Sequence, residues 1–125
     1  MKKSICFLII SLAASSCYKQ LSMEGFDKEK WLTYGEDCSE YRLNIAPHIL
    51  ENESILLEKT QNEVESLLGR AEEHELYNRN QKYFHYRLTP SDSCESYETL
   101  TFLSVRFNAI GRANLVQMML RDVDQ

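Results

Sequence analysis

The chain has few of the residues that most catalytic and metal-binding motifs require. It contains only four glycines, two prolines and three histidines in 125 residues. Four scattered glycines do not form a phosphate-binding loop, and there is no Gly-x-Ser-x-Gly nucleophile motif. No Cys-x-x-Cys pair occurs, and no two histidines lie four residues apart. We therefore expect neither a cofactor nor a metal site, and no enzymatic activity.

Basic residues are also scarce. The chain carries 14 lysines and arginines against 19 aspartates and glutamates, and its net charge is −5. An acidic chain without a basic run is poorly suited to binding the phosphate backbone of nucleic acids, and equally to binding anionic lipid headgroups by charge. We therefore exclude nucleic acid as a partner, and any attachment to a membrane must come from an acyl chain.

The main hydrophobic run, residues 5–14, is too short to span a bilayer. It follows two N-terminal lysines, as in a signal peptide. The run ends in the letters LAASSC, which resemble a bacterial lipobox, although Ala14 stands where leucine is usual. We expect residues 1–16 to be a lipoprotein signal peptide and Cys17 to carry the lipid (palmitate and related acyl chains). The alternative is cleavage nearby by the ordinary signal peptidase, with Cys17 incidental.

Cleavage before Cys17 would remove two lysines and leave 109 residues with a net charge of −7. This length is enough for one modest hydrophobic core. We expect residues 17–24 to be a lipidated tether and residues 25–125 to form a single domain. The tether lacks the acidic run that some lipoproteins use for surface export, which favours the cell envelope, at the outer membrane and facing the periplasm.

Two cysteines remain in the predicted domain, Cys38 and Cys94. In an exported, oxidising compartment such a pair is expected to form a disulfide bond. The bond would close a loop of about 55 residues and contribute roughly 3–4 kcal/mol to stability. The alternative is a pair of free, buried thiols.

Two helices are predicted in the first half of the domain. In the first, Ser39–Glu51, Ser39 is a candidate N-cap, and an apolar residue recurs at every fourth position. Pro47 lies inside this segment, so we expect one helix kinked at the proline.

The second predicted helix has a clear start and a clear end. Thr60 and Glu63 have the spacing of a capping box. Gly69 stands where a residue in the left-handed region would end the helix. Between them lies one apolar stripe, formed by Val64, Leu67 and Leu68.

After Gly69 the hydrophobic period changes to the alternation of β-strands. We predict strands at residues 72–77, 81–88, 99–107 and 113–121, with turns at 78–80 and 108–111. The last hairpin has the most regular pattern. Helices in the first half and strands in the second half predict an α+β fold, with two N-terminal helices packed on one face of a three- to four-stranded antiparallel sheet.

The sequence also resembles a known family. The run Lys59-Thr60-x-x-Glu63-Val64-x-x-Leu67-Leu68-Gly69, a tyrosine-rich strand, and then Leu103-x-Val105-x-Phe107-x-x-x-Gly111 look like the BamE/SmpA–OmlA group and the related β-lactamase-inhibitor-protein-like domains. The resemblance covers about two-thirds of the predicted mature chain, but Ala71 stands where the family often has proline. It implies a small exported α+β domain, and either an accessory role in outer-membrane assembly or an inhibitor-like domain that binds a hydrolase.

Aromatic residues are concentrated in two of the predicted strands. Alternation does not allow all of them to be buried on one face. An exposed tyrosine patch suits a partner-binding surface, because tyrosine offers apolar area with a polar tip. The alternative is ordinary cross-strand pairing of aromatic rings. We predict a protein-binding patch centred on Tyr77, Tyr83 and His85, although His85 by itself is most simply a solvated strand residue.

One acidic cluster with a histidine is the best candidate for an alternative, enzymatic function. Glu72, Glu73 and Glu75 surround His74, and a general acid–base pair requires residues of these types. A charged, solvated strand edge explains the same pattern more simply. We therefore expect a lipid-anchored envelope protein with a small protein-binding domain, and a small enzyme using Glu72, Glu73 and His74 is the less favoured alternative.

Overall fold

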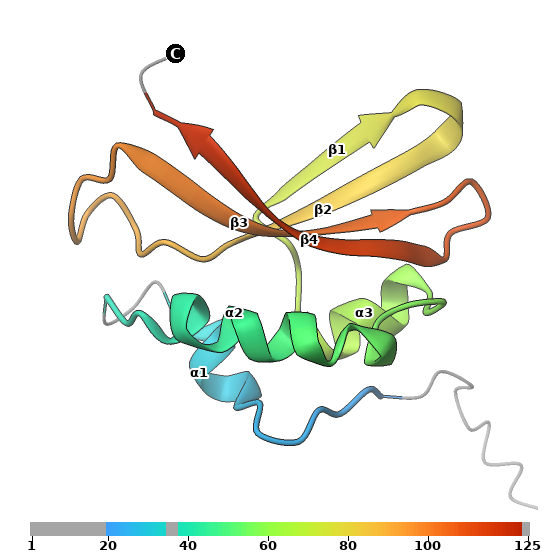
Figure 1. Cartoon of the computed structure of the whole chain (residues 1–125), viewed down its shortest axis with the longest axis horizontal. Helices are drawn as coiled ribbons and strands as arrows, with labels where there is room; N and C mark the ends of the chain where they lie inside the picture. Colours follow the sequence, from blue (N-terminus) through green and yellow to red (C-terminus); the bar gives the residue numbers. More distant parts are fainter. Residues whose placement is uncertain (1–19, 35–37, 124–125) are drawn as a thin grey trace, which may run out of the picture.

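The computed structural model describes residues 20–34 and 38–123, and it consists of a layer of helices beneath a four-stranded sheet (Figure 1). The predicted α+β class is confirmed. The order along the chain is three helices and then four strands. The elements are α1 (Lys28–Leu32), α2 (Tyr41–Glu51), the 3-10 turn η1 (Glu53–Ile55), α3 (Gln61–Leu68), β1 (Glu73–Tyr77), the turn η2 (Asn78–Asn80), β2 (Gln81–Arg87), β3 (Thr99–Phe107) and β4 (Ala113–Asp122).

Helix α3 begins with the predicted capping box and ends at the predicted glycine, but this glycine does not adopt the expected left-handed conformation. The Thr60 hydroxyl accepts a hydrogen bond from the Glu63 backbone N–H at 3.2 Å, and the Glu63 carboxylate accepts one from the Thr60 N–H at 3.3 Å. Gly69 follows with φ +70° and ψ −166°, outside the left-handed helical region and in a region open essentially to glycine alone. A Cβ atom at Gly69 would lie 2.5 Å from the Leu32 Cδ2 atom. The backbone conformation therefore requires glycine here, whereas the exposed Leu32 side chain could move away from a Cβ atom.

Helix α2 differs from its prediction at the start. It begins at Tyr41 rather than Ser39, and its N-cap residue Glu40 makes no side-chain capping bond. The Ser39 hydroxyl instead accepts a hydrogen bond from the Tyr41 N–H at 3.0 Å. Pro47 lies inside one continuous helix.

Helix α1 was not predicted, because five residues are too few to show helical periodicity. Its N-cap is Asp27, whose carboxylate accepts a hydrogen bond from the Lys30 N–H at 3.2 Å. The helix places Trp31 in the core, where the indole is completely buried. The indole N–H donates to the Leu68 carbonyl at 2.8 Å, which ties α1 to the end of α3.

The sheet is fully antiparallel, in the order β1-β2-β3-β4. All four predicted strands are confirmed to within one residue at either end. Phe84 and Tyr86 of β2, and Leu103, Val105 and Phe107 of β3, face the helices and form the core with Val64, Leu67 and Leu68 of α3. A register shift between Arg106 and Phe107 marks a β-bulge near the start of β4.

A disulfide bond joins Cys38 and Cys94, as predicted, with a Cα–Cα distance of 5.6 Å. It links the segment before α2 to the loop between β2 and β3. Disulfides persist in oxidising compartments, so the bond indicates a location outside the cytosol. No helix among residues 20–34 and 38–123 has the length and apolar character needed to cross a bilayer. The predicted signal peptide and Cys17 lie outside the described residues.

Candidate functional site

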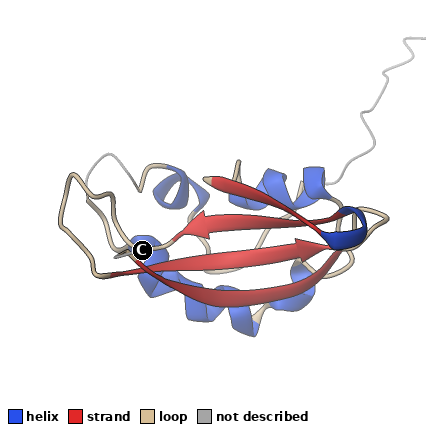
Figure 2. Cartoon of the chain, turned by 90° about the horizontal axis from the view of Figure 1, so that it is seen from above, coloured by secondary structure: helices blue, strands red, loops and turns tan. Residues whose placement is uncertain are grey.

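One face of the sheet packs on the helices, and among residues 20–34 and 38–123 no helix lies on the opposite face (Figures 1 and 2). Side chains alternate between the two faces along each strand. In register, His85 of β2 lies beside Glu73 of β1 and Ser104 of β3, and Ser104 lies beside Gln117 of β4. These residues belong to the helix-free side, which we call the open face. The predicted patch residues Tyr77, Tyr83 and His85 all lie on it.

A row of rings crosses the open face from β1 to β3, and an arginine of β4 lies at its end. The centroids of Tyr77 and Tyr83 are 5.8 Å apart in an edge-to-face arrangement, and those of Tyr83 and His85 are 5.6 Å apart and nearly parallel. His85 then meets Phe102 at 6.2 Å, and the Arg121 guanidinium lies 4.6 Å from the Phe102 ring. Tyr77 is 53% exposed, whereas His85 and Phe102 are both 2% exposed. The accessible part of the row is therefore the end at Tyr77, and the other end, at His85 and Phe102, is buried.

The burial of His85 contradicts the prediction of a solvated strand residue. Its Nδ1 atom lies 2.6 Å from the Ser104 hydroxyl, and its Nε2 atom lies 2.8 Å from the Glu75 carboxylate. Both ring nitrogens thus have partners, so burial leaves neither unsatisfied. The chain Glu75–His85–Ser104 spans three strands and fixes the plane of the imidazole on which Tyr83 stacks.

This chain contains the residue types of an acid–base–nucleophile triad, but its placement does not suit nucleophilic attack. Ser104 is 1% exposed and lies in the middle of β3, between two other strands. Its backbone N–H belongs to the sheet ladder and is not free to stabilise an oxyanion. The geometry instead positions His85 and Tyr83 within the surface.

The charged groups of the open face are largely paired with each other. The Arg121 guanidinium donates to both carboxylate oxygens of Glu73, at 2.9 and 3.0 Å. Arg106 donates to the Asn114 side-chain oxygen at 3.0 Å. Glu75 is hydrogen-bonded to His85. The face therefore presents aromatic rings and paired charges rather than a surface of one electrostatic sign.

The structure separates the residues of the predicted enzymatic cluster. His74 lies in register with Phe84 on the helix side and stacks on its ring at 4.4 Å. Glu73 lies on the open face with Arg121. Glu72 precedes β1 and pairs with Arg42 of α2. Strand alternation therefore divides Glu72, Glu73 and His74 among three environments, and the three do not form one site.

Arg42 is a buried junction between the helices and the sheet that sequence reasoning did not identify. Its side chain is 3% exposed and forms an ion pair with Glu72. It also donates to the carbonyls of Trp31 and Arg87, each at 2.9 Å. The guanidinium lies between two rings, 4.3 Å from Trp31 and 3.8 Å from Tyr34. No periodic pattern marks this residue, because an arginine on a predicted helix is normally assigned to the solvent face.

Burial shifts the pKa of both members of this pair. It raises the pKa of Glu72, and the nearby Arg42 charge offsets this only in part. Burial likewise lowers the pKa of Arg42 against the opposing effect of Glu72. The cost of burying the charges thus opposes their mutual attraction, which is typical of buried ion pairs. We assign the pair a structural role.

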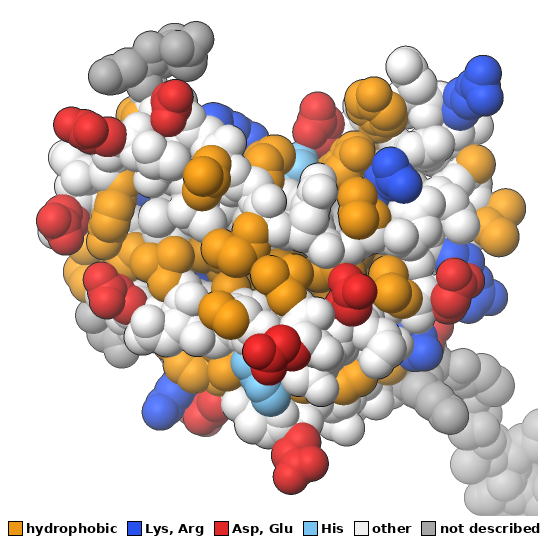
Figure 3. Space-filling model, viewed as in Figure 1, with side chains coloured by type: hydrophobic (Ala, Val, Ile, Leu, Met, Phe, Trp, Pro, Cys, Tyr) orange, Lys and Arg blue, Asp and Glu red, His pale blue; other side chains and the backbone are white. Residues whose placement is uncertain are grey.

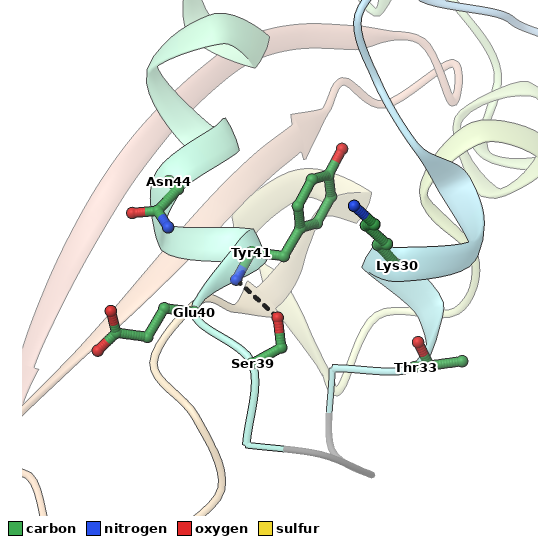
Figure 4. Close-up of a pocket in the computed structure, with 6 residues that line it drawn as sticks. All are labelled: Lys30, Thr33, Ser39, Glu40, Tyr41 and Asn44. Atoms are coloured by element: carbon green, nitrogen blue, oxygen red, sulfur yellow. Dashed lines mark hydrogen bonds between the residues drawn. The ribbon is translucent and has the colours of Figure 1, made fainter.

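A separate surface hollow of about 310 Å³ lies between α1 and the start of α2 (Figure 4). The Lys30 ammonium lies 5.9 Å from the centre of the Tyr41 ring. None of the predicted site residues lines the hollow. Its lining residues are Lys30, Thr33, Ser39, Glu40, Tyr41 and Asn44.

No cluster of three or more histidine, cysteine or acidic side chains able to hold a metal ion occurs in the part of the chain that the structure describes. Comparison with protein-family models, curated proteins and solved structures gives no match to this chain. The open face is therefore the candidate site on its geometry alone. The position of Tyr77 and Tyr83 on this face was foreseeable from strand alternation, whereas the Ser104 contact depends on the strand register.

Proposed function

We propose that this protein is a non-enzymatic, lipid-anchored envelope protein whose open face binds another protein. The observation that carries the proposal is the pair of rings, Tyr77 and Tyr83, at the accessible end of an aromatic row that no other described element covers. Tyrosine is enriched at protein interfaces, because it supplies a large rigid area with a polar tip.

The support for a protein partner comes from the rest of this face. Glu73 and Arg121, like Glu75 and His85, are already paired within the domain. A partner therefore gains little from an extended charged surface. It gains more from apolar and aromatic side chains that stack on Tyr77 and Tyr83. The buried His85 ring stacks against the Tyr83 ring. We therefore expect His85 to position Tyr83 rather than to contact the partner itself.

The anchor in this proposal is the acyl chain on Cys17, which would hold the domain at the outer membrane, facing the periplasm. The disulfide between Cys38 and Cys94 is consistent with such a compartment. The resemblance to BamE-type domains suggests an outer-membrane assembly complex as the partner. The resemblance to inhibitor-like domains suggests a hydrolase, and the identity of the captured protein decides between the two.

A photocrosslinking experiment tests the binding surface. A photoreactive amino acid at position 81, which pairs in register with Tyr77 on the open face, should capture one dominant protein when membranes carrying the full chain are illuminated. The double variant Tyr77→Ala/Tyr83→Ala should reduce the captured amount about tenfold or more, as expected for a loss of about 1.4 kcal/mol or more at an interface hot spot.

Tyr97→Ala is the matched control, since Tyr97 lies in the loop between β2 and β3, at the opposite end of β2 from the turn that follows Tyr77. It should leave the yield unchanged. Capture that is equally strong in the Tyr77→Ala/Tyr83→Ala variant would show that the two rings do not form the interface. Far-ultraviolet circular dichroism of the double variant confirms that the fold is retained.

The anchor has its own test. We expect Cys17→Ala to move the protein from the membrane fraction to the soluble fraction of fractionated cells, and to remove the mass added by acyl chains. One or two acyl chains account for nearly all membrane affinity in an acidic protein. A Cys17→Ala protein that stays in the membrane fraction with unchanged mass would refute lipidation at this residue.

A further inference from the structure

The outer edge of the sheet at β4 is open over most of its length. At its start, the segment before α3 covers this edge. The Glu58 N–H donates to the Ala113 carbonyl, and the Ala113 N–H donates to the Lys59 carbonyl, each at 2.8 Å. Beyond this point, within the described residues, β4 pairs only with β3. Residues 114–120 therefore expose backbone donors and acceptors on one side, and we call them the β4 edge.

The two edges of the sheet differ in length and in charge. β1 has five residues, of which Glu73 and Glu75 are acidic, and short charged edges resist pairing with other strands. β4 has ten residues, and the stretch 113–120, with the sequence ANLVQMML, contains no charge and no proline. Charged residues make up 26% of the chain. The β4 edge, unlike the β1 edge, has none of the charges that would hinder the addition of another strand.

Hydrophobic side chains also gather beneath this edge. Met118 pairs with Leu103, and Leu120 pairs with Thr101, on the helix side of the sheet, yet they are 42% and 69% exposed. Figure 3 shows hydrophobic side chains along a band between the sheet layer and the helix layer, on the side where β4 and α2 lie in front. On the open face, Leu115 and Met119 are partly buried. β4 thus carries apolar side chains on both faces, although the polar Gln117 lies between Leu115 and Met119 on the open face.

We propose that two copies of this protein pair through their β4 edges, antiparallel to each other, to form one continuous eight-stranded sheet. A two-fold axis brings the same surface together on both copies, so an apolar band meets an identical apolar band. The stretch 113–120 is uncharged, so the two strands meet over it without repulsion despite the acidic composition of the chain. Each strand supplies the backbone groups that the other lacks, as in other cases of strand addition.

The test measures the mass of the full chain in mild detergent by light scattering coupled to size-exclusion chromatography. We expect the wild-type protein to be a dimer that dissociates on dilution. Leu120→Lys places a charge in the apolar band, at the end of the β4 edge, and should weaken the dimer about tenfold or more, since burying an unpaired charge is costly. Because Leu120 is mostly exposed in the single copy, the variant should keep its fold.

Ile110→Lys is the matched control. Ile110 is 82% exposed in the turn between β3 and β4, outside the β4 edge, and its replacement should leave the dimer intact. Amide hydrogen exchange adds a second measurement, in which the amides of residues 114–120 should exchange more slowly in the dimer than in dilute monomer. A wild-type monomer at the highest soluble concentration would overturn the proposal, and so would a dimer that Leu120→Lys leaves unchanged.

The β4 edge is separate from the partner-binding surface. Tyr77 and Tyr83 lie on β1 and β2, at the opposite edge of the sheet from β4. The variant Tyr77→Ala/Tyr83→Ala should therefore leave the dimer unchanged, and Leu120→Lys should leave partner capture unchanged. Failure of either proposal can thus be told apart from failure of the other.

Discussion

Replacing Arg42 with alanine is expected to lower the free energy of unfolding by about 3–5 kcal/mol, the usual cost of removing one partner from a buried ion pair. The Arg42 side chain is 3% exposed and that of Glu72 is 26% exposed. The substitution leaves the Glu72 carboxylate without its charged partner and removes the hydrogen bonds to the Trp31 and Arg87 carbonyls. Chemical denaturation monitored by circular dichroism measures the change.

The structure offers a matched control in the other arginine–glutamate pair. Arg121 and Glu73 are each 43% exposed, so water screens their attraction. Arg121→Ala should therefore cost only about 0–1 kcal/mol. A loss at Arg42 as small as the loss at Arg121 would show that the buried junction does not stabilise the domain.

The double variant Arg42→Met/Glu72→Gln separates the two sources of the loss. Removing both charges leaves no unpaired carboxylate in the junction, and a buried ion pair exchanged for uncharged residues often loses little stability. We expect this variant to be more stable than Arg42→Ala. If the two variants are equally unstable, the bonds to the backbone carbonyls, and not the charge pair, account for the loss.

Removing the disulfide should have an effect of similar size. We expect Cys38→Ser/Cys94→Ser to lower the free energy of unfolding by about 2–5 kcal/mol, because the bond shortens the unfolded chain across 56 positions of sequence. The measurement is a denaturation curve of this variant beside the wild-type protein with and without reductant. Reduced wild-type protein and the variant should unfold at the same denaturant concentration.

Thiol labelling checks the bond directly. In denatured protein that has not been reduced, Cys38 and Cys94 should resist alkylation, and prior reduction should make both reactive. Ready labelling of both residues without reduction would refute the bridge. The alternative of two free thiols would then apply.

The elements that the sequence predicts well are those defined by local patterns. The capping box of Thr60 and Glu63 specifies the start of α3, and the alternation in residues 99–107 and 113–121 specifies the last hairpin. In both cases the relevant partners lie within a few residues or across a single turn. The disulfide was also predictable, because compartment and cysteine count left Cys38 and Cys94 as the only pair.

The residues that sequence reasoning missed depend on contacts between distant segments. Arg42 is buried because α1, α2 and the Glu72 carboxylate converge on it, and these segments meet only in the folded chain. His85 is buried because the strand register places Ser104 on one side of it and Glu75 on the other. Helix α1 is too short for its propensity to be visible, and it is held by the tertiary contacts of Trp31.

The position of Trp31 makes it a built-in optical reporter of unfolding. It is the only tryptophan in the chain, and it is completely buried with the Arg42 guanidinium 4.3 Å from its ring. It lies in the helix layer, whereas Tyr77, Tyr83 and the β4 edge belong to the sheet. Its emission should therefore change when the domain unfolds and remain steady when the open face or the β4 edge is occupied. Fluorescence at this one residue can thus separate loss of the fold from loss of binding in the variants of the open face and of the β4 edge.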